Sequence, residues 1–168
     1  MSSGDGSAAG DGVERRSAPL RSISRKVPSL VAETTDVTIR NDLADIAVLR
    51  DAVDRVGANS RIPSAALYDL QIVLDEIVSN VIKYAWPAGG AHEVRVRLTV
   101  DRSAIEVEVV DDGQPYDPRE APAPARAAPG RRPRPGGLGI HIAKKLVDGF
   151  DYQRIGPHNR VRLTKRFL

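Results

Sequence analysis

The stretch that decides the fold is Leu67-Tyr-Asp-Leu-Gln-Ile-Val-Leu-Asp-Glu-Ile-Val-Ser-Asn-Val-Ile-Lys-Tyr-Ala-Trp86, the longest run of apolar residues with helical spacing in the chain. At 3.6 residues per turn, one face of this run is apolar, as expected of an amphipathic helix packed on a core. The apolar face comprises Leu67, Leu70, Leu74, Ile77, Val78, Val81 and Ala85. One flank of that face carries polar residues, namely Asp69, Glu76, Asn80 and Lys83.

Glu76 and Asn80 are the polar pair with the clearest chemical potential. They stand four residues apart at the margin of the apolar face, so both side chains can point into one cleft. A carboxylate there can act as a base, and a carboxamide can act as an oxygen ligand. The alternative is structural: Glu76 is a surface acid that orients Lys83 or a water molecule.

Further elements are predicted on both sides of this helix. A short strand over 35–40 precedes a helix that Asn41-Asp42 can cap and that ends near Gly57. After the long helix, alternating apolar residues predict strands over 93–100 and 105–109, and a helix from Ile140 is closed by Gly149. The chain ends with a strand over 150–154, a turn over 156–159 and a strand over 161–167. Adjacent strands joined by tight turns indicate an α/β two-layer sandwich, with a mixed, mainly antiparallel sheet and the helices on one face.

Two segments lack the periodicity of helices and strands. Residues 1–33 are rich in Gly, Ser, Ala and Arg, which predicts a disordered tail before one domain over 34–168. The later part of residues 114–136 consists mostly of Pro, Ala and Arg. A clear helical pattern of apolar residues begins directly after this segment. We therefore expect a mobile loop inside the domain. Its cations are Arg126, Arg131, Arg132 and Arg134.

The composition argues against several classes of protein. The chain has no cysteine, so disulfides and thiolate metal sites are excluded. No apolar run is long enough to cross a bilayer, and the first residues do not resemble a signal peptide. The net charge of +3 comes from arginines spread among nearly as many acids, which does not favour a nucleic-acid-binding protein.

Three polar clusters stand at the ends of predicted elements: Glu76 and Asn80 on the long helix, Asp111-x-Gly113 after a strand, and Gly137-x-Gly139 before a helix. In this order they resemble the GHKL ATPase superfamily, and within it the small anti-sigma factor serine/threonine kinases, which are histidine-kinase-like ATPases. Glu76-Ile-Val-Ser-Asn80 is similar to the N box of that superfamily. Val109-Val-Asp-Asp-Gly-Gln-Pro-Tyr-Asp-Pro118 and Gly136-Gly-Leu-Gly-Ile140 are similar to its two glycine boxes, and Asn159 with Leu163-Thr-Lys-Arg-Phe167 is typical of this group.

The resemblance implies a Bergerat-type fold that binds ATP with Mg²⁺ beneath a flexible lid. By the resemblance, Asp111 accepts a hydrogen bond from the adenine amino group, and Gly113 lets the backbone approach the base. Asn80 supplies an oxygen to the Mg²⁺ ion, and Glu76 is the catalytic base. The glycine loop formed by Gly137, Leu138 and Gly139 wraps the phosphates.

The function that the resemblance implies is a cytoplasmic protein serine/threonine kinase that works by partner switching. Such a kinase sequesters a sigma factor and phosphorylates an anti-sigma factor antagonist, with no direct contact to nucleic acid or membrane; a homodimer is compatible with the resemblance. Two alternatives stay open. One is a nucleotide-gated binding module without catalysis. The other is a detached histidine kinase catalytic domain, although His92, His141 and His158 do not lie on a predicted dimerising helix.

Overall fold

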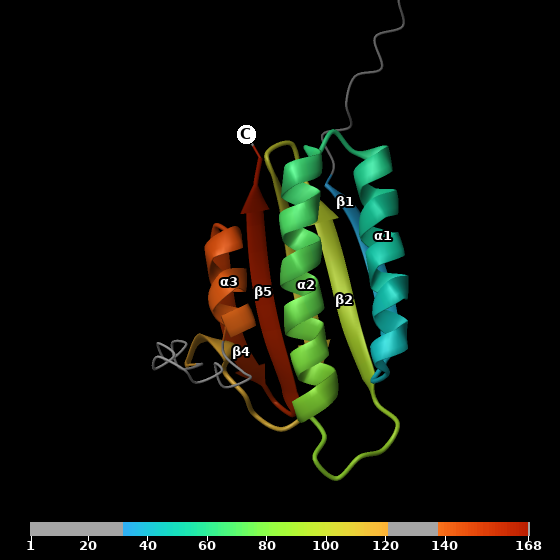
Figure 1. Ribbon diagram of the computed structural model, residues 1–168, viewed down its shortest axis with the longest axis vertical. Coiled ribbons are helices and arrows are strands. Elements are labelled where there is room, and N and C mark those ends of the chain that lie inside the picture. Colours follow the sequence, from blue (N-terminus) through green and yellow to red (C-terminus); the bar gives the residue numbers. More distant parts are fainter. Residues whose placement is uncertain (1–31, 121–137, 168) are drawn as a thin grey trace, which may run out of the picture.

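The computed structural model describes residues 32–120 and 138–167. These residues form a five-stranded sheet in the order β1-β2-β3-β5-β4, with three helices on one of its faces and α2 in the middle (Figure 1). The strands are β1 (Glu33–Arg40), β2 (Glu93–Val100), β3 (Ala104–Asp111), β4 (Gly149–Ile155) and β5 (His158–Arg166). The helices are α1 (Ile46–Asn59), α2 (Ser64–Tyr84) and α3 (Leu138–Leu146). The predicted two-layer sandwich is confirmed, and every strand pairing in these residues is antiparallel.

The two faces of the sheet differ because strand residues alternate in direction. Along β2, Val94, Val96 and Leu98 are buried under the helices, whereas Arg95 and Arg97 are exposed on the opposite face. The antiparallel register pairs apolar residues of neighbouring strands, for example Val96 with Val109. The core therefore lies between the sheet and the helices, and the other face of the sheet carries the charged side chains.

Helix α2 is the central element of the core, as its sequence predicts. Leu70, Val73 and Val78 are fully buried. The buried surface is shifted from the predicted stripe, since Ala66 and Val73 are inside while Leu67 and Val81 are only half-buried. Helices α1 and α3 flank α2 on its two sides (Figure 1), so the arc of α2 that faces other elements is wider than one stripe.

Helix α1 runs past the residue where the sequence predicts its end. Asp42 caps a short 3₁₀ turn, Leu43–Asp45, by accepting a hydrogen bond from Ala44 N, and α1 then continues through Gly57 to Asn59. The reason is packing. A Cβ built on Gly57 would lie 2.3 Å from Leu67 Cδ1, so the glycine lets α1 and α2 approach closely instead of ending the helix.

The hairpin at the end of the chain also differs from its prediction. Gly156, at φ +55°, allows a tight turn, so that β5 begins at His158 and includes Asn159, which was expected in the turn. Asn159 consequently pairs with Asp111 across β3 and β5. Upstream, α3 ends at Leu146, before Gly149, because Asp148 N already donates to Thr164 O of β5.

Residues 1–31, where a tail is predicted, and 121–136, most of the predicted lid, lie outside the described residues. Strand β1 starts at Glu33, which pairs with Val100. No helix in the described part of the chain combines the length and the apolar character of a membrane span.

Candidate functional site

A cavity of about 210 Å³ opens between α2, α3, the ends of β3 and β5, and the loop that follows β3. Its apolar walls come from Ile77 and Val81 of α2, Ile140 of α3 and Val161 of β5. Several polar residues line the same space, among them Asn80, Asp111 and Asn159. A mainly apolar slot with a few fixed polar groups is suited to a flat aromatic ligand with a polar edge.

Asp111 is the buried acid of this cavity, with 4% of its surface exposed. Its Oδ1 accepts two hydrogen bonds, from Gly113 N at 2.8 Å and from Asn159 Nδ2 at 2.8 Å. Burial raises the pKa of Asp111, and its hydrogen bonds with Asn159 and Gly113 and the charge of Arg154 oppose that rise. No hydrogen bond among the described residues uses Oδ2. Oδ2 is therefore the oxygen available to a ligand.

Asn159 connects this acid to the edge strand β4. Its Nδ2 donates to Asp111 Oδ1 and, at 3.0 Å, to Gln114 O. Its Oδ1 accepts from Tyr152 Oη and from Arg154 Nη1, each at 2.8 Å. The sequence marked Asn159 as typical of the family but gave it no role, and Tyr152 and Arg154 were not singled out.

Gly113 lies at the closest contact between the loop after β3 and the end of α2. A Cβ on Gly113 would fall 2.3 Å from Ala85 Cβ and 2.9 Å from Ala85 O. The next residue fastens the loop, because Gln114 N donates to Ala85 O and Gln114 Nε2 donates to Tyr84 O, both at 2.8 Å. The glycine is needed for this close approach, which brings the loop backbone to the cavity.

The loop is also tied to α3 and β4 further along. Arg119 contacts Asp117 and, through Nη1 at 2.8 Å, Asp151 Oδ1 of β4. Lys144 of α3 donates to Arg119 O at 2.7 Å. Arg119 holds the pKa of Asp117 below its usual range. These contacts fix the short 3₁₀ turn Pro118–Glu120, whose buried Pro118 lines the cavity.

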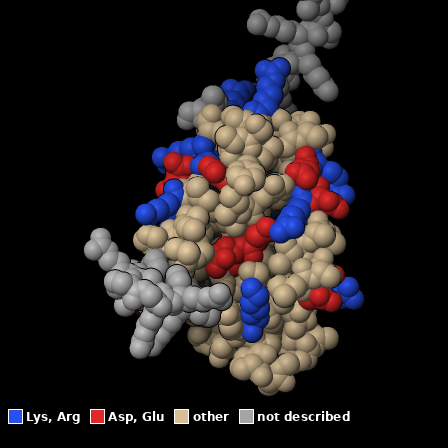
Figure 2. Space-filling view, in the orientation of Figure 1, with Lys and Arg blue, Asp and Glu red and all other residues tan. Residues whose placement is uncertain are grey.

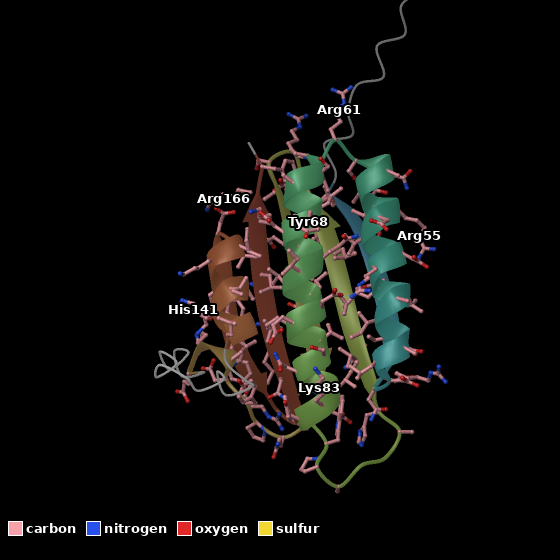
Figure 3. All side chains as sticks on the ribbon, viewed as in Figure 1. Arg55, Arg61, Tyr68, Lys83, His141 and Arg166 are labelled. Carbon is pink, nitrogen blue, oxygen red and sulfur yellow. The ribbon has the colours of Figure 1, made fainter. Side chains whose placement is uncertain are left out.

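Glu76 and Asn80 meet on α2, as their spacing predicts. Asn80 Nδ2 donates to Glu76 Oε1 at 2.7 Å, so the amide nitrogen faces the acid and Oδ1 faces away from it. No ion pair among the described residues joins Glu76 to Lys83, which is exposed near the end of α2 (Figure 3). The structural alternative, an acid that orients Lys83, therefore has no contact to support it.

Helix α3 brings its first residues against this pair. A Cβ on Gly139 would fall 1.9 Å from Glu76 Cδ, so the acid occupies the space that a side chain at position 139 would need. Leu138 is 53% exposed beside it, and Gly137 lies outside the described residues. Acidic side chains gather near the middle of the helix-covered face, over α2 (Figure 2).

A second hollow, of about 500 Å³, lies on the other side of the sheet end and is lined by Arg40, Glu93, Arg95 and Asp112, among others. Its charged groups are largely engaged elsewhere. Arg40 pairs with Asp45, and Asp112 accepts from Trp86 Nε1 at 2.9 Å. Asp111 borders both hollows. We place the functional site in the smaller cavity because its apolar walls adjoin this acid together with Asn80 and Asn159.

Asn80 fits a magnesium ion by the chemistry of its donor group. Mg²⁺ in nucleotide sites keeps several waters and takes few protein ligands, so one free amide oxygen suffices. In the described part of the chain, no three His, Cys, Asp or Glu side chains converge as an all-protein metal centre would require. A metal here would therefore be shared with the ligand's phosphates.

Comparison with known proteins shows the family of this chain. The model of the histidine kinase-like ATPase domain family matches residues 39–165. The chain belongs to this family. The family model spans every sequence-predicted site residue, including Gly137, which the structure does not describe.

Individual relatives of this ATPase domain are distant. The chain is 24% identical over 112 residues to the serine/threonine-protein kinase BtrW of Bordetella bronchiseptica, covering 67% of this chain and 79% of the relative. It is 28% identical over 120 residues to the serine-protein kinase RsbW of Halalkalibacterium halodurans, covering 69% and 73%. The crystal structure of the RsbU and RsbW domains of a Mycobacterium tuberculosis protein matches with a TM-score of 0.56 at 16% identity, covering 80% of this chain and 32% of that one. That likeness concerns the fold.

Proposed function

We propose that this histidine kinase-like ATPase domain is a protein serine/threonine kinase that binds ATP in the cavity and transfers its γ-phosphoryl group to a protein hydroxyl. The observation that carries the proposal is the contact of Glu76 with Asn80 and Gly139. It joins a candidate base to a candidate metal ligand beside the start of α3. Both named relatives are described as serine or serine/threonine kinases.

The adenine base occupies the apolar slot in this proposal. Ionised Asp111 is an acceptor only, and its free Oδ2 matches the amino group of adenine. Ile77 and Ile140 supply apolar walls to the cavity that receives the ring. Gly113, which has no side chain, lets the backbone after β3 approach the base.

The phosphates extend from this slot toward Asn80 and the start of α3. Asn80 Oδ1, which faces away from Glu76, would hold a Mg²⁺ ion, and the ion would neutralise charge on the phosphate oxygens. Gly137, Leu138 and Gly139 wrap the phosphates, and the free N–H groups of the first turn of α3, which begins at Leu138, face the negative charge.

Glu76 accepts the proton of the incoming serine or threonine hydroxyl. As that oxygen forms its bond to the γ-phosphorus, the bond between the γ-phosphorus and the bridging oxygen breaks, and ADP leaves. Phosphoryl transfer depends mainly on positioning and charge neutralisation. The hydrogen bond from Asn80 Nδ2 and the contact with Gly139 hold the Glu76 carboxylate in one place.

The partners follow from the resemblance to anti-sigma factor kinases. The protein acts in the cytoplasm, where it sequesters a sigma factor and phosphorylates an anti-sigma factor antagonist on a serine or threonine. Nucleotide state biases the choice between the two partners. The second candidate function is a nucleotide-gated binding module without catalysis, which shares the Asp111 cavity but makes no use of Glu76.

Two paired measurements test the proposal. Calorimetric titration with ATP and Mg²⁺ should show binding by the wild type and its loss in Asp111→Asn. ADP formation with water as the acceptor should be lost in Glu76→Gln, while ATP binding persists. Labelled phosphate should then pass from γ-labelled ATP to a candidate antagonist with the same dependence on Glu76. Absence of ATP binding by the wild type would reject the nucleotide site. Unchanged turnover in Glu76→Gln would reject the catalytic role of Glu76, and ATP binding without turnover by the wild type would favour the binding module.

A further inference from the structure

Strand β4 holds the amide of Asn159 in one orientation. A carboxamide has an oxygen that only accepts hydrogen bonds and a nitrogen that only donates them. Two donors converge on Asn159 Oδ1, namely Tyr152 Oη and Arg154 Nη1, each at 2.8 Å. A rotated amide would turn its nitrogen toward the Arg154 guanidinium, which can only donate, and lose that bond, although the Tyr152 hydroxyl can also accept. The nitrogen of Asn159 is therefore directed away from β4.

That orientation decides which oxygen of Asp111 a ligand meets. Asn159 Nδ2 reaches Asp111 Oδ1 at 2.8 Å, where Gly113 N also donates. With Oδ1 holding two donors, Oδ2 is left for the cavity. Arg154 has a further effect, because its Nη1 also donates to Gly113 O at 2.8 Å and so ties the loop after β3 to the edge strand.

We propose that Arg154 and Tyr152 are positioning residues for base selection, acting through Asn159 to present Asp111 as a hydrogen-bond acceptor to the base. This inference rests on the proposed nucleotide site. A carboxylate at that place favours the 6-amino group of adenine and repels the 6-oxo group of hypoxanthine or guanine. Selectivity is then set on β4, by residues that do not line the cavity.

Loss of Arg154 and loss of the Tyr152 hydroxyl should have different effects on the protonation of Asp111. Arg154 of β4 lowers the pKa of Asp111, and Asp112, directly after β3, raises it. Tyr84 of α2 and Tyr116 of the loop after β3 line the same cavity. Loss of Arg154 removes a positive charge, so Asp111 takes up a proton at higher pH than in the wild type. Loss of the Tyr152 hydroxyl removes one donor and no charge.

The experiment measures dissociation constants for ATP and for inosine triphosphate, each with Mg²⁺, across a pH series. Arg154→Met should weaken ATP binding about three- to tenfold with little change for inosine triphosphate. The ratio of the dissociation constant for inosine triphosphate to that for ATP should therefore fall. As the pH is lowered, the ATP affinity of Arg154→Met should also begin to fall at a higher pH than that of the wild type, because Asp111 is protonated earlier. Tyr152→Phe should lower this ratio of dissociation constants by a smaller factor. It should leave unchanged the pH at which half of the ATP affinity is lost, which we call the pH midpoint.

Arg162→Met is the matched control. It removes a guanidinium from the neighbouring strand, on the other face of the sheet, where Arg162 pairs with Glu108 at 3.3 Å. It should preserve both the ratio and the pH midpoint. Melting curves of all variants show whether each is folded. If Arg154→Met unfolds, Tyr152→Phe still tests the relay, by which we mean the action of Tyr152 and Arg154 on Asp111 through Asn159.

The outcomes separate this inference from the function on which it rests. If the wild type binds ATP and Asp111→Asn does not, but Arg154→Met and Tyr152→Phe both keep the wild-type ratio and pH midpoint, the relay is refuted and the nucleotide site stands. If the wild type binds neither nucleotide, both the relay and the site are rejected.

Discussion

Glu76 and Gly139 occupy complementary space: the carboxyl carbon of Glu76 lies where a Cβ at position 139 would stand, 1.9 Å from that ideal position. Two segments that are far apart in the sequence, the middle of α2 and the start of α3, therefore meet at an acid. The acid also accepts a hydrogen bond from Asn80, one turn along α2. Because both neighbours limit its movement, small changes at position 139 should act through the position of Glu76.

Gly139→Ala is expected to reduce ATP turnover about 100-fold or more, the range in which a displaced proton acceptor acts. ATP binding should weaken far less, since Asp111 is unchanged. The measurement is ADP formation at saturating ATP. In the Glu76→Gln background, Gly139→Ala should add little further loss, because both changes remove the same function. Additive losses would show that Gly139 acts independently of the acid.

Asp111→Asn is expected to stabilise the protein while removing ATP binding. Burial raises the pKa of Asp111, so the folded state binds the proton more tightly than the unfolded chain. The free energy of unfolding then falls as pH rises from the ordinary value of 3.8 through the folded pKa. At neutral pH, burial of the ionised carboxylate lowers the free energy of unfolding, and a neutral asparagine avoids this cost. We expect Asp111→Asn to raise the free energy of unfolding by about 1 kcal/mol, typical of changes at functional sites.

Melting curves between pH 3 and pH 8 test this expectation. The Tm of Asp111→Asn should exceed that of the wild type at pH 7, and the gap should close as the pH approaches the acid end of the series. Asp75→Asn, at an exposed ion pair with Arg50 on the helix surface, is the control for loss of a carboxylate. A lower Tm for Asp111→Asn at pH 7 would mean that its hydrogen bonds outweigh its burial.

Gly113→Ala should destabilise the protein by about 1–3 kcal/mol, since the added methyl group cannot fit 2.3 Å from Ala85 Cβ. The loop must then move away from the end of α2, and ATP affinity should fall with it. Ala85→Gly removes the opposing methyl group and should restore part of both losses when combined with Gly113→Ala. Denaturant unfolding and ATP titration of the two single variants and the double variant provide the test.

Lys165→Met should destabilise the protein by about 2–3 kcal/mol. Lys165 Nζ donates to Asp69 Oδ2 of α2 and to Leu146 O at the end of α3, each at 2.7 Å, and its side chain is only 17% exposed. The variant leaves both acceptors without this partner. Lys145→Met, at an exposed position of α3, should change stability by less than about 0.5 kcal/mol.

A second substitution tests whether Lys165→Met lowers stability because it leaves the Asp69 carboxylate without its ion pair. Asp69→Leu in the Lys165→Met background should recover part of the stability measured by denaturant unfolding. If the double variant is no more stable than Lys165→Met, the lost contact with Leu146 O explains the effect instead.

The sequence predicted the order of elements and the two-layer sandwich because the periods of the apolar residues differ clearly between α2 and β2. It also predicted that Glu76 and Asn80 meet, since four residues on a helix are neighbours in space. Boundaries were less predictable. Gly57 looked like the end of a helix, but its missing side chain serves the contact with Leu67, and such a contact between two helices leaves no local signal.

The support of Asp111 could not be predicted for a related reason. Arg154 and Asn159 are five residues apart on two strands of a hairpin, and their contact depends on where the turn begins. With a turn over 156–159, Asn159 stands outside the ladder. Only the tight turn at Gly156 puts it opposite Asp111.

That short turn gives the hairpin a fixed length. Successive residues of a strand point to opposite faces, so one residue inserted or deleted between Ile155 and His158 would exchange the two faces of β5. Arg160 would then enter the core, and Asn159 would face outward. We expect homologous chains to vary in length along the loop between α2 and β2, where residues 87–91 are exposed, and to keep this hairpin at constant length.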